Sequence, residues 1–167
     1  MKTNRQEGFS LIELLIVVAI IGIIAAIAIP NLLASRRAAN EGSAQSSIRT
    51  IHSAEAVYQA TIGNGGFGTL RTADEPAAGQ SLATQRLVDG QLGLGTKSGY
   101  NFAVPVAGLA VGPPATFWAS AWPANVQPAT RTGNRSFGIT EDGVLRGVVA
   151  DAVADRAAVD AMAALGN

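Results

Sequence analysis

Residues 8–37 read GFSLIELLIVVAIIGIIAAIAIPNLLASRR, and this stretch decides the fold. From Leu14 to Ser35 it contains no charged side chain. As an α-helix, a segment of that length rises about 33 Å at ~1.5 Å per residue, which is enough to cross a bilayer core of about 30 Å. The stretch therefore predicts a membrane-spanning helix.

One carboxylate, Glu13, lies at the start of this apolar run. A charge in a bilayer is costly, about 2.5–3.5 kcal/mol at mid-helix on insertion scales, so it usually has a partner. Cleavage of the bond between Gly8 and Phe9 would create an α-amine four residues before Glu13. That amine would lie within one helical turn of the carboxylate, or within its reach from a neighbouring chain. Such a cut would therefore give Glu13 a partner of opposite charge.

A cleaved secretory signal is the alternative interpretation of the same stretch. The small residues at positions 26–28 could mimic its cleavage site, which would leave a soluble exported binding protein beginning near Ile29. Two features count against it, because Glu13 would lie inside the apolar core and no break separates that core from the cut.

The stretch GFSLIELLIVVAIIGIIAAIAIPNLLASRR resembles the amino-terminal region of type IV pilins and of the pseudopilins of type II secretion systems. This resemblance implies that a prepilin peptidase cuts after Gly8 and methylates the new terminal residue, Phe9. It assigns subunit assembly to Phe9 and Glu13, and a helix kink to Pro30. Gly22 is a second weak point in the helix.

The resemblance implies a structural subunit rather than an enzyme. The first expectation is a type IV pilus filament polymerised through the amino-terminal helix, and the alternative is the major pseudopilin of a type II secretion system. Expected partners are the prepilin peptidase, identical subunits, membrane lipid before assembly, and an inner-membrane assembly platform with a cytoplasmic ATPase. The precursor is expected in the bacterial inner membrane with a cytoplasmic amino terminus, and the processed chain in a surface pilus or periplasmic pseudopilus.

The helical pattern resumes beyond Pro30 with an amphipathic half. Apolar and small residues recur there at three- and four-residue steps, at Ala44, Ser47, Ile48, Ile51, Ala54, Tyr58 and Ile62. The glycine cluster at residues 63–68 should end the helix. We therefore expect a leader peptide at residues 1–8, a transmembrane and filament-core helix at residues 9–35, and a pilin-like globular domain at residues 36–167.

Strand-like runs follow at residues 100–106, 116–120, 135–140 and 144–148. Asp142-Gly143, between the last two runs, favours a hairpin turn. This order predicts an α+β fold, in which the second half of the long helix packs on a small antiparallel β-sheet.

Two further segments carry helix signals. Leu82, Leu87 and Leu92 could anchor a short helical segment by packing in the core. Asp89-Gly90 and residues 93–95 are the residues expected to interrupt or end it. The Ala-rich residues 150–165 predict a terminal helix or a mobile tail, and helix propensity favours the helix.

The chain offers few residues for catalysis, metal binding or disulfide formation. His52 is its single histidine and it has no cysteine, so neither a zinc site nor a disulfide is expected. His52, Ser53 and Glu55 are close in sequence, but no Gly-x-Ser-x-Gly elbow accompanies them, and we expect a structural or exposed histidine.

Glu141 and Asp142 are the calcium candidates. A hard cation needs about six oxygens, and two adjacent turn carboxylates are usually solvated, so no cofactor is expected. The formal net charge is zero, which also argues against a nucleic-acid partner.

Overall fold

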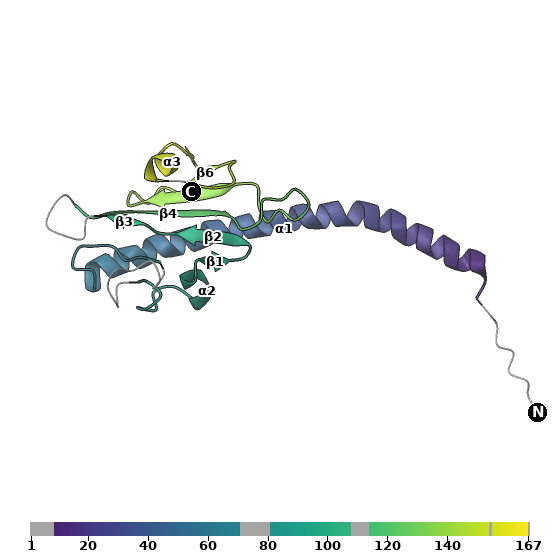
Figure 1. The fold of residues 1–167 in the computed structure, drawn as a ribbon, viewed down its shortest axis with the longest axis horizontal. Helices are drawn as coiled ribbons and strands as arrows, with labels where there is room; N and C mark the ends of the chain where they lie inside the picture. Colours follow the sequence, from purple (N-terminus) through teal and green to yellow (C-terminus); the bar gives the residue numbers. More distant parts are fainter. Residues whose placement is uncertain (1–8, 71–80, 108–113, 154, 167) are drawn as a thin grey trace, which may run out of the picture. The chain divides into compact units, whose positions relative to one another are not determined.

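The structure is a computed structural model, and it describes residues 9–70, 81–107, 114–153 and 155–166 (Figure 1). The chain forms two compact units, residues 1–36 and residues 37–167. The long helix α1, Leu11–Thr61, supplies residues to both. The second unit adds an antiparallel sheet, so the predicted α+β class is confirmed.

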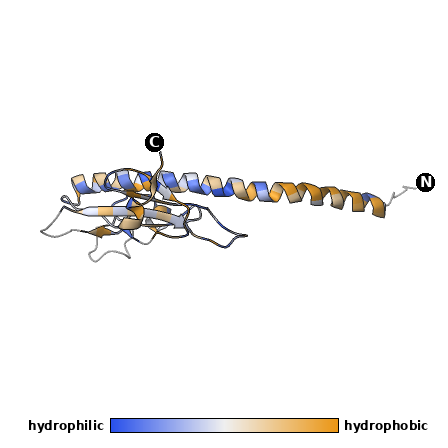
Figure 2. Ribbon diagram, turned by 90° about the horizontal axis from the view of Figure 1, so that it is seen from above, coloured by the Kyte–Doolittle hydropathy of each residue, from blue (hydrophilic) through white to orange (hydrophobic). Residues whose placement is uncertain are grey.

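In the first unit, the start of α1 is apolar and has no buried side chain among its described residues. Figure 2 shows this as an almost continuous hydrophobic ribbon. Among the described residues, α1 is the helix long and apolar enough to cross a membrane. Gly22 and Pro30 both lie inside the helix. Pro30 has no N–H to donate to the carbonyl of Ala26, so the predicted weak point removes one helical hydrogen bond.

In the second unit, α1 buries the face that the sequence predicts, with two differences. The buried residues on that face are Ala44, Ser47, Ile48, Ile51, Ala54 and Tyr58, together with Glu55, which the periodicity did not include. Ile62 is 48% exposed, so its assignment to the face was wrong. The helix ends at Thr61, and the N–H groups of Ile62 and Gly63 both bond to the carbonyl of Tyr58. The bond from Gly63 spans five residues and is wider than an α-helical turn, so the regular helical spacing ends here.

The sheet has antiparallel neighbours in the order β1-β2-β4-β5-β6-β7, and β3 also pairs with β4. Its inner side chains, including Phe102, Ala119, Phe137 and Ile139, join Ile48 and Ile51 of α1 in one core. The strands are β1 (Thr96–Lys97), β2 (Tyr100–Ala103), β3 (Val106–Ala107), β4 (Thr116–Pro123), β5 (Ser136–Thr140), β6 (Arg146–Val148) and β7 (Ala163–Ala164).

Several predicted strand bounds need correction. The run at 100–106 divides into β2 and β3 at Pro105, which has no N–H for a sheet ladder. β4 continues to Pro123, which ends the strand opposite Tyr100. β6 starts at Arg146 rather than at residue 144, because the Val144 N–H bonds to the Asp142 side chain instead of to the sheet.

The predicted turn between β5 and β6 is confirmed. The two strands pair antiparallel on either side of it. Gly143 has a φ of 74°, a left-handed conformation that glycine adopts without strain.

The predicted terminal helix is mostly wrong. In the described part of residues 150–165, only α3, Arg156–Asp160, is helical, with Asp155 as its N-cap. The chain then forms β7, where Ala163 and Ala164 pair with β6. Hydrogen bonding to an open sheet edge outweighs the modest helix propensity of alanine there.

The short helix α2, Gly90–Gly93, lies where Asp89-Gly90 and residues 93–95 were predicted to end a helix. Asp89 is its N-cap, and the Asp89 carboxylate accepts from the Leu92 N–H at 2.9 Å. Aspartate before glycine therefore starts a helix here instead of ending one. Leu82 and Leu92 are fully buried, as expected of residues that pin the segment.

The loop between β4 and β5, residues 124–135, is fastened to α1 by polar side chains. Their partners are backbone groups of the loop, so the contacts fix the path of its main chain. Arg37 donates to the carbonyls of Arg131 and Pro128, each at 3.3 Å, Asn40 donates to the carbonyl of Thr132 at 2.8 Å, and Glu41 accepts from the Asn134 N–H at 2.7 Å.

Candidate functional site

The start of α1 holds the candidate assembly residues. Phe9 is 80% exposed and precedes the helix. The Ser10 N–H donates to Glu13 Oε2 at 2.9 Å, and the Leu14 N–H donates to the Ser10 carbonyl. Ser10 is therefore the N-cap, and Glu13 makes the return bond of a capping box from the third helical position. Glu13 satisfies a backbone donor that would otherwise have no partner inside the helix.

Sequence reasoning overlooked this local role of Glu13. The signal was present, because Ser10-Leu11-Ile12-Glu13 fits the Ser-x-x-Glu pattern of a capping box. Of the predicted processing residues, Phe9 lies next to this capped turn, whereas Gly8 lies outside the described residues.

The surface of the first unit is the second element of the site. Large aliphatic side chains surround the helix, and a surface of this kind needs lipid or protein to cover it. Its large apolar residues, each at least 46% exposed, are Leu11, Ile12, Leu14, Leu15, Ile16, Val17, Val18, Ile20, Ile21, Ile23, Ile24, Ile27, Ile29 and Leu32.

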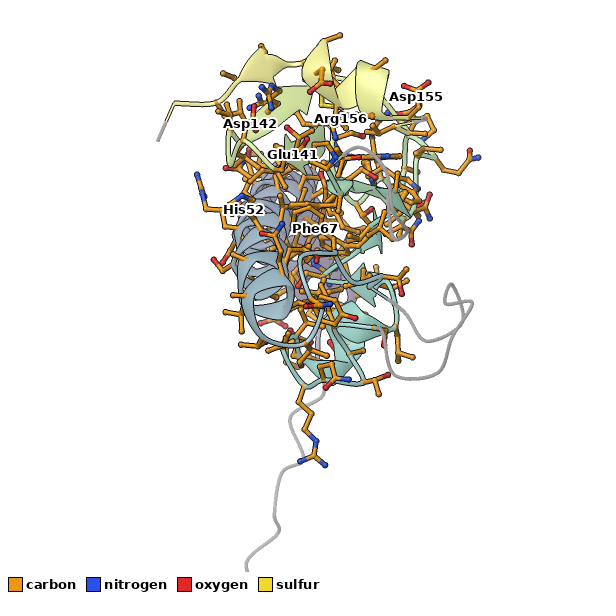
Figure 3. All side chains as sticks on the ribbon, turned by 90° about the vertical axis from the view of Figure 1, so that its left-hand side faces the viewer. His52, Phe67, Glu141, Asp142, Asp155 and Arg156 are labelled. Carbon is orange, nitrogen blue, oxygen red and sulfur yellow. The ribbon has the colours of Figure 1, made fainter. Side chains whose placement is uncertain are left out.

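The two calcium candidates lie in the β5–β6 turn and are paired with arginines (Figure 3). Glu141 accepts two hydrogen bonds from the Arg156 guanidinium, at 2.6 and 2.8 Å. Asp142 accepts from Arg146 at 2.5 and 3.2 Å. These carboxylate oxygens therefore already have cationic partners.

The same pairs lower the pKa of both acids. Hydrogen bonds from Arg146 lower the pKa of Asp142 to about 2. Burial is the largest single influence on Glu141 and raises its pKa, but the hydrogen bonds and charge of Arg156, together with a backbone hydrogen bond, make the net shift downward. Among the described residues, no group of three histidine, cysteine, aspartate or glutamate side chains could hold a metal ion. The expectation that no cofactor binds stays a prediction, and calcium at this turn would require the two arginines to move.

The residues of the catalytic alternative do not come together. The His52 ring lies 5.9 Å from the Phe117 ring, against the β5–β6 turn. The Ser53 hydroxyl is exposed and donates to the Arg49 carbonyl of the preceding helical turn. Glu55 is fully buried and bonds to Gly68. The three side chains therefore have three different surroundings and form no common site.

The amino-terminal segment matches a known family. Residues 3–29 match the prokaryotic N-terminal methylation motif. This range contains Phe9 and Glu13 and most of the exposed apolar surface. No solved structure matches the chain significantly.

The chain is also similar to proteins of two bacterial systems. The chain is 63% identical over 38 residues to the major component of the type IV wide pilus of Thermus thermophilus, covering 23% of this chain and 29% of the relative. It is 47% identical over 51 residues to the type IV major pilin of Myxococcus xanthus, covering 30% and 23%. It is 36% identical over 59 residues to the type II secretion system core protein G of Aeromonas hydrophila, covering 35% and 41%.

The chain matches less than half the length of each of these relatives. The chain therefore carries the N-terminal methylation motif and is similar, over part of its length, to type IV major pilins and to the core protein G of type II secretion systems.

Proposed function

We propose that this chain is the structural subunit of a type IV pilus filament and not an enzyme. A prepilin peptidase cuts its precursor after Gly8, Phe9 is methylated, and the mature chain polymerises with identical copies through α1. The observation that carries the proposal is the exposed apolar helix that begins with a single capped carboxylate, within the methylation motif.

The physical basis of assembly is replacement of one apolar environment by another. In the precursor, lipid covers the apolar start of α1. The subunit can leave the bilayer only if that surface is buried again, so the helices of neighbouring subunits take the place of lipid. An inner-membrane platform with a cytoplasmic ATPase supplies the work, and the precursor keeps its amino terminus in the cytoplasm.

Glu13 sets the register between subunits. After cleavage, the methylated amine of Phe9 is one residue before the N-cap, and its positive charge needs a partner in the apolar filament core. The Glu13 carboxylate of an adjacent subunit provides it. Since Glu13 already accepts from the Ser10 N–H, the incoming amine finds a carboxylate whose orientation is fixed by the helix start.

A second candidate is the major pseudopilin of a type II secretion system. The similarity to core protein G of Aeromonas hydrophila favours it, because that match covers a longer part of this chain than the pilin matches do. The pseudopilin would form a short periplasmic filament instead of a surface fibre, with the same cleavage and assembly chemistry.

The test is the intact mass and amino-terminal sequence of the mature chain, recovered separately from sheared surface fibres and from the cell envelope. Methylated Phe9 in sheared fibres is the expected result for a pilin. The same terminus confined to the envelope would identify a pseudopilin. A mature terminus near Ile29 would overturn both, because the apolar helix would have been removed as an ordinary secretory signal.

A further inference from the structure

Glu55 is the carboxylate that the described structure buries completely. It lies on the sheet-facing side of α1, between Ala54 and Tyr58. Its Oε2 atom accepts a hydrogen bond from the Gly68 N–H at 2.9 Å. Its Oε1 atom is buried without a hydrogen-bond partner. Burying a carboxyl group in the core costs free energy when one of its two oxygens has no hydrogen-bond partner.

The bond to Gly68 joins α1 to the segment that follows it, residues 62–70. This segment turns back sharply, because the Gly66 N–H bonds to the Gly63 carbonyl at 2.8 Å. It then places Phe67 in the core, with its ring 4.6 Å from the Phe117 ring. Glu55 and Phe67 thus hold the same short segment, one by a polar bond and one by packing.

Among the described residues, the carboxyl group has no charged partner to offset ionisation. On α1, the titratable neighbours one turn away are His52, which is half-buried against Phe117, and Tyr58, which is buried. Residues 62–70 and strand β4 contain no ionisable side chain. The adjoining residues 81–88 contribute Arg86, which is exposed. Burial is the dominant influence on Glu55, and the bond from Gly68 opposes it only in part.

We propose that Glu55 is a proton-operated latch, which holds residues 62–70 against α1 while the carboxyl group is protonated and releases them when it ionises. The neutral acid keeps the bond from Gly68 without placing a charge in the core. The ionised form gains water only if the segment lifts away. The released proton passes to solvent, and no other group is required.

The pH range of the latch follows from its surroundings. Burial raises the pKa of Glu55 from 4.5 to about 8 in the closed form. In the open form, the exposed carboxyl group regains its ordinary value. The equilibrium constant for opening therefore rises up to about tenfold per pH unit between roughly pH 5.5 and 7.5, and levels off above pH 8. This behaviour concerns the second unit alone and holds whichever filament the chain builds.

Chymotrypsin cleavage after Phe67 measures the open form, because that side chain is 6% exposed when the segment is closed. The full mature chain in detergent is digested briefly at pH 6 to 9, and the fragment beginning at Gly68 is quantified by mass spectrometry. The wild-type rate is divided by that of Glu55→Gln at each pH, which removes the pH dependence of the protease. Gln keeps the acceptor for Gly68 and cannot ionise.

The control is Glu41→Gln. Glu41 is on the same helix and also accepts one backbone N–H, that of Asn134, but it is only half-buried. We expect the wild-type to Glu55→Gln ratio to rise at least tenfold from pH 6 to 8 and then to flatten, while Glu41→Gln follows the wild type. A ratio that stays flat would overturn the proposal. So would a wild-type chain whose cleavage after Phe67 does not accelerate beyond that of the other chymotryptic sites.

Discussion

Val159 of α3 lies directly over Gly138 of β5, so closely that a β-carbon on Gly138 would be 2.6 Å from the Val159 Cγ1 atom. Val159 is fully buried, and Gly138 lies in the strand between Phe137 and Ile139. The absence of a side chain at one position of β5 therefore lets α3 cover that face of the sheet.

Replacement of Gly138 by Ala should destabilise the second unit by about 1–3 kcal/mol, because the added methyl group overpacks this contact. Chemical unfolding of the detergent-solubilised chain, followed by the fluorescence of Trp118 and Trp122, measures the free energy of unfolding. In the double variant with Val159→Ala, the space is restored, and the two losses should sum to more than the loss of the double variant. Strictly additive losses would show that the contact is not the cause.

Two substitutions at Glu13 separate its charge from its capping role. Gln preserves the bond to the Ser10 N–H but carries no charge, whereas Ala removes both. If Glu13 pairs with the Phe9 amine, both variants should insert into the membrane and both should fail to yield normal filaments. Fibres are counted by electron microscopy of sheared fractions. Abundant normal filaments from Glu13→Gln, with few from Glu13→Ala, would mean that capping is the essential function.

Glu55 should make the stability of the second unit depend on pH. Its folded-state pKa of about 8 exceeds the ordinary value of 4.5. Between these values the folded state holds a proton that the unfolded state has lost. The contribution of Glu55 to the free energy of unfolding is therefore greatest below pH 4.5. It falls by up to about 1.4 kcal/mol per pH unit as the pH rises, and it levels off above pH 8.

The measurement is the free energy of unfolding from pH 5 to 9 for the wild type and for Glu55→Gln. The difference between the two chains should follow the slope above, since every other titrating group is shared. Asp142 acts in a separate range, because its pKa of about 2 removes stability only as the pH falls below about 4. Parallel curves for the two chains would contradict the assignment of Glu55.

Calcium should not stabilise the wild-type chain. Glu141 and Asp142 are already bound by Arg156 and Arg146, so a cation would have to displace both guanidinium groups. The melting temperature measured in millimolar calcium should equal that measured after chelation. A rise of several degrees that disappears when Asp142 is replaced by Asn would instead establish the turn as a calcium site.

Prediction from the sequence succeeded where one strong pattern decides the structure. The run from Leu14 to Ser35 has no competing interpretation as a strand, and the helix is continuous through it. The buried face of α1 followed the helical period up to Tyr58. The turn at Asp142-Gly143 also followed from local chemistry, because only the conformation of two residues was at issue.

Prediction from the sequence failed where a contact with a residue distant in the sequence determines the local structure. Ala163 and Ala164 favour a helix by themselves, yet they pair with β6. Glu55 looks like a surface residue, since a carboxylate is rarely buried, and its burial depends on Gly68, which follows a turn outside the helix. Asp89-Gly90 was ambiguous, because the same pair can end one helix or cap the next.

The fastening of residues 124–135 to α1 has a mechanical consequence. A pulling force applied to the sheet domain along α1 would act first on the hydrogen bonds of Arg37, Asn40 and Glu41. Each of these bonds would transmit part of the force to the backbone of that loop. The load then reaches β4 and β5, the strands at either end of the loop, so several bonds share it in parallel. A chain without cysteine can in this way resist pulling without a covalent cross-link.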